Sequence, residues 1–151
     1  MYKLMVPVDG SEHSNNVVRF LIGKCSFYKE PPEIHLLNVQ YPIASGNVRK
    51  FIGHEEIERY YHDEGMAALQ PARDLLDRAG VPYVFHVGVG EPAETIVRYA
   101  REQDCQQIVM SPRGLGTVLG MLMGSVATKV LHLSEVPVLL VKSGAGASQI
   151  G

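Results

Sequence analysis

Short apolar runs recur along the chain, and each is followed by a turn or by a segment with helical periodicity. Apolar runs of this length, closed by Gly, Pro or polar residues, are typical of buried strands. Because the runs are mostly apolar rather than alternating, we expect strands that are covered on both faces, as in a parallel sheet. The predicted strands are Leu4–Val8, Ile34–Val39, Val84–Val87, Gln107–Met110 and Pro137–Val141.

A long helical stretch covers roughly Glu55–Ala79. Gly65 and Pro71 lie inside it, and proline removes a backbone donor and clashes with the preceding turn. We therefore expect a kink or two separate helices there. Gly80 is predicted to end the stretch as a C-cap glycine.

Shorter helical segments fill the other gaps between the strands. Alternation of strands and helices predicts a parallel sheet with right-handed crossovers. Such sheets bind ligands beyond the carboxyl ends of their strands, so candidate residues should directly follow a strand. The shorter helices are expected from Ser11 or Ser14 to about Phe27, from Pro92 to Ala100, and over Val126–Leu133.

Composition narrows the class of protein. The chain has 151 residues, of which 46% are hydrophobic and 20% charged, which favours one globular domain over disorder. A net charge of −2 gives no electrostatic basis for binding nucleic acid, and no apolar run approaches the length of a bilayer span. Cys25 and Cys105 form no metal or disulfide motif, which favours a reducing cytoplasm. We expect a domain over 1–142 and a flexible Gly/Ala/Ser tail over 143–151.

The segment after the fourth strand carries the most informative chemistry. It reads Ser111-Pro112-Arg113-Gly114, then nine residues, then Gly124-Ser125-Val126 at a helix start. Free amides and the dipole at a helix N-terminus attract phosphate, although an ordinary loop with Ser125 as the N-cap would look the same. Asp9, directly after the first strand, is placed to accept hydrogen bonds from a ribose or a base; its alternative is a plain turn residue.

Other familiar motifs are absent or misplaced. The chain has no Walker lysine motif and no GxSxG. Gly88–Ala93 matches GxGxxA but belongs to the third strand, so we interpret Gly90-Glu91-Pro92 as a tight turn into a capped helix. His54, Glu58 and His62 have a spacing that can hold a metal, but their polar surroundings favour a solvated face, and no metal site is predicted.

Taken together, these segments resemble the universal stress protein family over nearly the whole chain. The resemblance implies a five-stranded α/β fold, adenine nucleotide alpha hydrolase-like, with sheet order 3-2-1-4-5 and helices on both faces. The matching segments, in order, are Val6–Ser11, His35–Val39, Gly90–Ile96, Ser111–Ser125 and Val136–Val141.

The resemblance also implies an ATP site. ATP-binding members have G-x-x-G, nine residues, then G-[S/T]; this chain departs from that pattern only at Ser111, which replaces the first glycine. Mg²⁺ is expected to accompany the nucleotide, retaining several waters. The positions that match the nucleotide contacts of the family are Pro7, Val8, Asp9, Val39, Met110, Ser111, Arg113, Gly114, Gly124, Ser125 and Val126.

The expected function is ATP-dependent regulation in a stress response, with dimerisation through Pro137–Val141, an apolar edge strand. Two alternatives remain. One is an interaction module of the same fold with an empty pocket, which Ser111 would favour. The other is a slow ATPase or nucleotidyl transferase, for which Arg113 is the only cation in the loop and no general base is evident.

Overall fold

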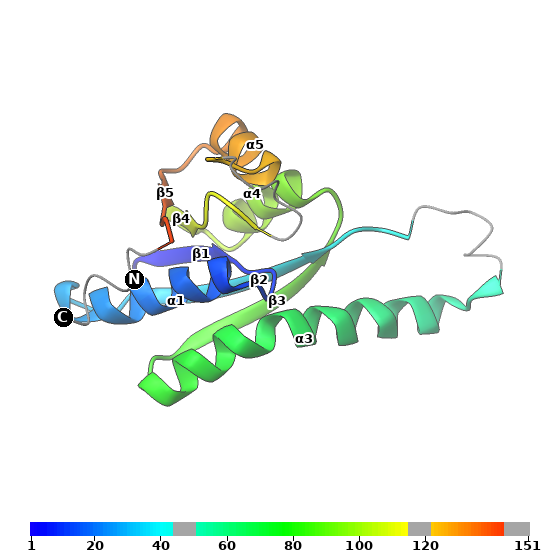
Figure 1. Ribbon diagram of the computed structural model, residues 1–151, viewed down its shortest axis with the longest axis horizontal. Coiled ribbons are helices and arrows are strands. Elements are labelled where there is room, and N and C mark those ends of the chain that lie inside the picture. Colours follow the sequence, from blue (N-terminus) through cyan, green and yellow to red (C-terminus); the bar gives the residue numbers. More distant parts are fainter. Residues whose placement is uncertain (44–50, 115–121, 144–151) are drawn as a thin grey trace.

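A five-stranded parallel sheet forms the centre of the molecule, with strand order β3-β2-β1-β4-β5 (Figure 1). The computed structural model describes residues 1–43, 51–114 and 122–143. All the predicted strands, their direction and their order are confirmed, with small shifts at the ends. The strands are β1 Lys3–Pro7, β2 Glu33–Gln40, β3 Tyr83–Val89, β4 Gln107–Met110 and β5 Val138–Leu140.

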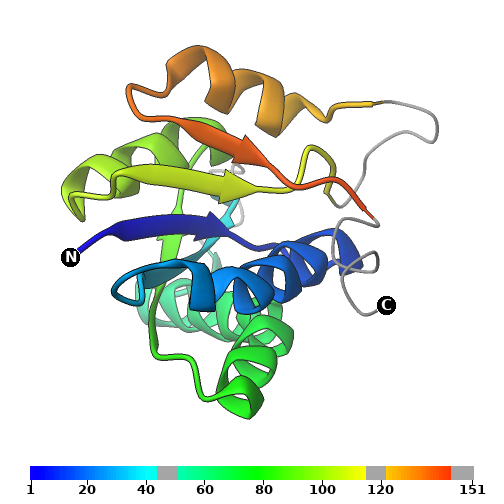
Figure 2. The same ribbon diagram turned by 90° about the vertical axis from the view of Figure 1, so that its left-hand side faces the viewer.

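Helices cover both faces of the sheet, as the apolar strands require (Figure 2). One face packs against α1 and α3, and the other packs against α4 and α5. β1 serves both cores, because Leu4 and Val6 belong to the first and Met5, between them, belongs to the second. The helices are α1 Glu12–Lys24, with a 3-10 turn at Cys25–Phe27, α3 His54–Ala79, α4 Pro92–Glu102 and α5 Ser125–Leu133.

Of the two expectations for the long helix, the division into two helices is wrong. α3 runs unbroken from His54 to Ala79 with Pro71 inside it. A proline in a helix interior costs about 3 kcal/mol, but the fully buried Leu69 and Leu76 each contribute about 1.5–3 kcal/mol of burial. Packing on the sheet therefore outweighs the lost hydrogen bond. The predicted C-cap is confirmed, since Gly80 has φ +68°.

Gly65 has a packing role that the helical pattern did not reveal. It is buried on the face of α3 that meets the sheet. A Cβ on Gly65 would lie 2.5 Å from Val87 Cγ1, closer than nonbonded atoms approach. Glycine here lets α3 lie directly against β3.

Side chains cap two of the helices at their N-termini. The Ser11 hydroxyl accepts the Ser14 amide of α1 at 3.3 Å. The Glu91 carboxylate accepts the Ala93 and Glu94 amides of α4 at 3.2 and 2.8 Å, so the predicted turn into a capped helix is confirmed. In the ranges that the structure describes, no helix is long and apolar enough to cross a membrane.

Candidate functional site

A cavity of about 920 Å³ lies at the carboxyl ends of the strands, within the size range of small-molecule sites. It is formed by segments that follow β1, β2 and β4, together with the start of α5. All eleven residues singled out in the sequence line it, although their contact with a ligand stays a prediction. They are Pro7, Val8, Asp9, Val39, Met110, Ser111, Arg113, Gly114, Gly124, Ser125 and Val126.

Asp9 is held in place by the first turn of α1. Its Oδ1 accepts the Ser14 hydroxyl at 2.6 Å and the Ser11 amide at 3.0 Å. The Asp9 amide in turn donates to Ser14 Oγ at 2.9 Å. Ser14, a cavity residue that sequence reasoning considered only as a helix cap, therefore fixes the orientation of this carboxylate.

Asp9 also lies against Gly114, in the segment Ser111–Ser125 that we call the glycine loop. A Cβ on Gly114 would lie 2.7 Å from Asp9 Oδ2. The loop backbone therefore approaches this carboxylate more closely than any side chain would allow. Gly114 is needed for space rather than for its backbone angles, because its φ is not positive.

Ser111, which replaces the first glycine of the family pattern, is compatible with the local backbone. Its φ lies outside the positive range, so glycine is not required by the backbone there. Its Oγ accepts the Arg113 amide at 3.1 Å, which ties the hydroxyl into a local turn.

The two ends of the loop are joined by one short hydrogen bond. The Gly124 amide donates to the Pro112 carbonyl at 2.6 Å. The prediction that the Gly124 amide would be available to a phosphate is therefore wrong, because the protein itself uses that donor. Gly124 still lines the cavity as the N-cap of α5, a place the alternative interpretation gave to Ser125.

The three amides that follow Gly124 in α5 are not used by the hydrogen bonds of the helix. The first hydrogen bond of the helix runs from the Thr128 amide to the Gly124 carbonyl at 3.1 Å, so the amides of Ser125, Val126 and Ala127 precede it. Unlike α1 and α4, α5 has no side-chain cap. All three residues line the cavity, where such amides offer donors and a partial positive charge.

Only three of the described lining residues carry a formal charge, namely Asp9, Glu64 and Arg113. Arg113 Nε is shielded from solvent, and within the described residues it has no hydrogen-bond partner. A buried charged donor without an acceptor is costly, and an anion in the cavity would supply one. No group of three or more potential metal ligands occurs among the described residues.

Sequence reasoning missed the wall that α3 contributes. The N-terminal part of α3 extends beyond the carboxyl ends of the strands (Figure 1). The helix meets the β1–α1 turn at Gly10, whose φ is +84° and where a Cβ would lie 3.3 Å from the Ala68 Cα. This contact joins residues far apart in the sequence, so no local pattern reveals it. The α3 residues that line the cavity are Tyr60, Glu64, Ala67 and Ala68.

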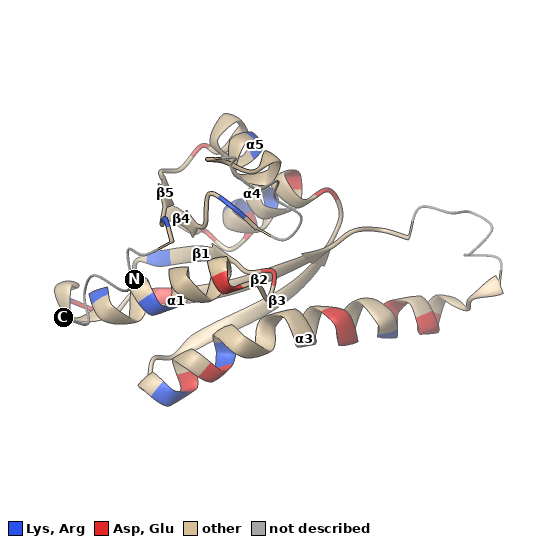
Figure 3. Ribbon diagram, in the orientation of Figure 1, with Lys and Arg blue, Asp and Glu red and all other residues tan. Residues whose placement is uncertain are grey.

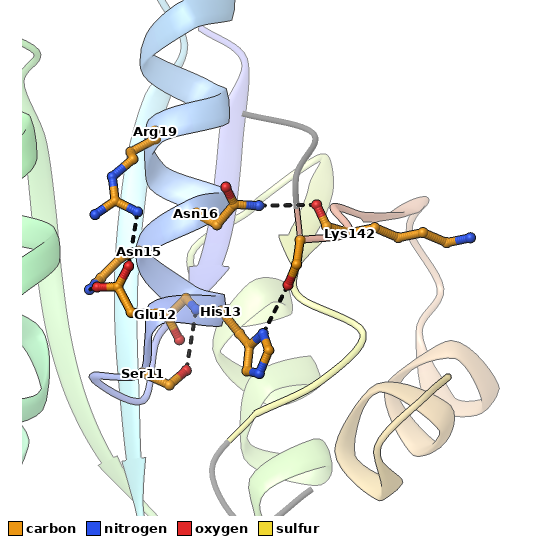
Figure 4. Close-up of polar contacts among 9 residues, drawn as sticks. Ser11, Glu12, His13, Asn15, Asn16, Arg19 and Lys142 are labelled. Carbon is orange, nitrogen blue, oxygen red and sulfur yellow. Dashed lines mark hydrogen bonds and ion pairs between the residues drawn. The ribbon is translucent and has the colours of Figure 1, made fainter. Parts of the chain in front are cut away.

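The chain leaving β5 is tied to the same helix that orients Asp9 (Figure 4). Asn16 Nδ2 donates to the Lys142 carbonyl at 3.0 Å, and His13 Nδ1 lies 3.0 Å from Ser143 Oγ. Ser143, assigned to the tail in the sequence, is thus anchored on α1. The rest of the predicted tail, 144–151, and the loop residues 115–121 lie outside the described residues.

The fold and the chain segments around this cavity define a known class. The model of the universal stress protein family matches residues 1–142, and the chain belongs to that family. A universal stress protein of Thermus aquaticus is 43% identical over 144 residues, covering 94% of this chain and all of the relative.

Solved structures agree with this assignment. Hypothetical protein MJ0577 superposes with a TM-score of 0.77 at 26% identity, covering 93% of this chain and 95% of the other. A universal stress protein in complex with cAMP has a TM-score of 0.66 at 25% identity, covering 93% and 96% of the two chains.

Proposed function

We propose that this protein binds an adenine nucleotide in the cavity and acts as a nucleotide-dependent regulator in the cytoplasm. The observation that carries the proposal is the N-terminus of α5, where Ser125, Val126 and Ala127 line the cavity and their amides precede the first hydrogen bond of the helix. Phosphate is the ligand that such a helix start favours. Asp9, fixed by Ser14, supplies an acceptor for ribose or base. The related protein that binds cAMP supports an adenine ligand.

ATP accompanied by Mg²⁺ is the nucleotide that the family motif favours. No cluster of protein ligands for the metal exists in the described residues, so phosphate oxygens and water would hold the Mg²⁺. In this proposal the nucleotide bridges the β1–α1 turn and the start of α5, and thereby changes the affinity of the protein for a partner. Regulation rather than catalysis is the function that we propose for this nucleotide.

Titration calorimetry with Mg-ATP and with AMP tests this proposal. Binding is expected for the wild-type protein. It is expected to be abolished in Gly124→Val, because the new side chain would lie in the cavity wall beside the first amides of α5. Circular dichroism of the variant verifies its fold. No heat and no thermal shift with either nucleotide at millimolar concentration would reject the proposal.

We also propose that two copies pair through Pro137–Val141. β5 is an edge strand of the sheet, and Leu139 on it is 38% exposed. Leu131 and Leu133 of the neighbouring α5 are exposed as well, so apolar surface continues beyond the strand. An open apolar edge favours a two-fold contact. Sedimentation velocity of the wild type and of Leu139→Glu tests this, and a monomeric wild type would reject it.

A further inference from the structure

The charges around the cavity favour an anion of low charge over a highly charged one. Among the described lining residues Arg113 is the one cation, while Asp9 and Glu64 are acidic. The sequence adds no other charge to the loop, since every residue between Arg113 and Lys129 is uncharged. Acidic residues also recur along α3, which forms one wall (Figure 3).

The positive charge available to a phosphate is therefore limited. Arg113 contributes one unit, and the N-terminus of α5 contributes about half a unit. A phosphate monoester carries about −1.5 to −2 at neutral pH, so these two sources offset at most one phosphate group, and Asp9 and Glu64 leave no positive charge for further ones. Two further phosphate groups would add charges that no described residue of the cavity neutralises.

We propose, on the basis of the proposed function, that the site prefers adenosine monophosphates, cyclic ones included, over ADP and ATP. Arg113 is the residue that fixes the accepted charge. Its Nε is buried and has no hydrogen-bond partner among the described residues, and a single phosphate group would supply the missing acceptor. Glu64, on the α3 wall, disfavours the longer polyphosphates by repulsion. ATP binds chiefly as its Mg²⁺ complex, in which the metal lowers the charge that the cavity meets.

Calorimetric titration with AMP, cAMP, ADP and ATP, first in EDTA and then with Mg²⁺, tests the preference. In EDTA we expect AMP to bind about tenfold or more tightly than ATP, because uncompensated buried charge is costly. Mg²⁺ should raise the affinity for ATP and so remove part of this difference, and it should leave the affinity for cAMP unchanged. Arg113→Gln should lower the affinity for AMP by about tenfold, the usual effect of losing a hydrogen bond to a charged group.

Glu64→Gln isolates the repulsive part of the preference. Glu64 is an exposed residue, so the substitution should leave the fold intact. It should reduce the ratio of the AMP affinity to the ATP affinity by about threefold, as expected for one partly screened surface charge. Glu58→Gln is the matched control, because Glu58 is also exposed on α3 but does not line the cavity. It should change neither affinity.

A double variant, R49Q with K50Q, extends the test to two basic residues that lie outside the described ranges. The order of the affinities should be unchanged in it. ATP binding as tightly as AMP in EDTA would overturn the charge preference while leaving nucleotide binding intact. Absence of heat with all four nucleotides would overturn the proposed function, and the preference with it.

Discussion

Asp9 and Gly114 meet across the cavity so closely that a single methyl group on the glycine would come within 2.7 Å of the Asp9 carboxylate. The carboxylate cannot easily retreat, because Ser14 and the Ser11 amide hold its other oxygen. The position of Gly114 is thus set by the turn between β1 and α1. This relationship explains why the loop needs glycine at 114 although its φ is not positive.

Gly114→Ala should therefore weaken nucleotide binding by about tenfold or more while leaving the fold intact. The methyl group would push apart Asp9 and the loop, and so separate the two sides of the site. Calorimetry with AMP measures the effect. Gly53→Ala is the control, because a Cβ there meets nothing within 4 Å; equal affinity of both variants for AMP would contradict the prediction.

Ser111→Gly tests the departure from the family pattern. Since the Ser111 hydroxyl accepts the Arg113 amide at 3.1 Å, its removal should loosen the turn that positions Arg113. We expect nucleotide affinity to stay the same or to fall by up to about fivefold, the effect of one ordinary hydrogen bond. If serine instead crowded the ligand, calorimetry would find tighter binding in the glycine variant.

Gly65→Ala should destabilise the protein by about 1–3 kcal/mol, the usual cost of overpacking. In an unpacked helix the same change stabilises by about 0.5–1 kcal/mol. At Gly65 the new methyl group would meet Val87 Cγ1 at 2.5 Å, so steric conflict determines the sign. Urea unfolding measures the free energy, and Gly23→Ala, at an exposed position of α1, should show no such loss.

Stability should also fall in mild acid because of a histidine pair on β2 and β3. His35 Nδ1 lies 3.0 Å from His86 Nε2, and their rings are stacked. Burial, and then the neighbouring His35, lower the pKa of His86 below 6.5. A histidine with a lowered pKa contributes stability above its unfolded pKa and loses it as the pH falls through the folded value.

The midpoint of urea unfolding should therefore be constant above a pH of about 7 and decrease below about 6.5. His86→Phe should make this decrease shallower, because it removes the group that binds an extra proton on unfolding. An unchanged slope in the variant would assign the acid sensitivity to other residues.

The strands and their parallel direction were predictable because apolar runs of strand length alternate with helical segments along the chain. Their order in the sheet was predictable only through the resemblance to the family. The cavity residues were also predictable in position, since the carboxyl ends of neighbouring parallel strands meet at one edge. The continuity of α3 was not, because the effect of Pro71 depends on how much surface the helix buries. The position of Glu64 in the cavity wall was not predictable either, because it follows from the contact of Gly10 with Ala68.

The hydrogen bond from the Gly124 amide to the Pro112 carbonyl closes the glycine loop at its base. An insertion between these residues would leave both anchors in place, and doubling the length of a closed segment costs only about 0.6 kcal/mol. This stretch, whose two anchors line the cavity, is therefore a natural place to graft a fluorescent reporter peptide that would turn the protein into an optical sensor of its own ligand.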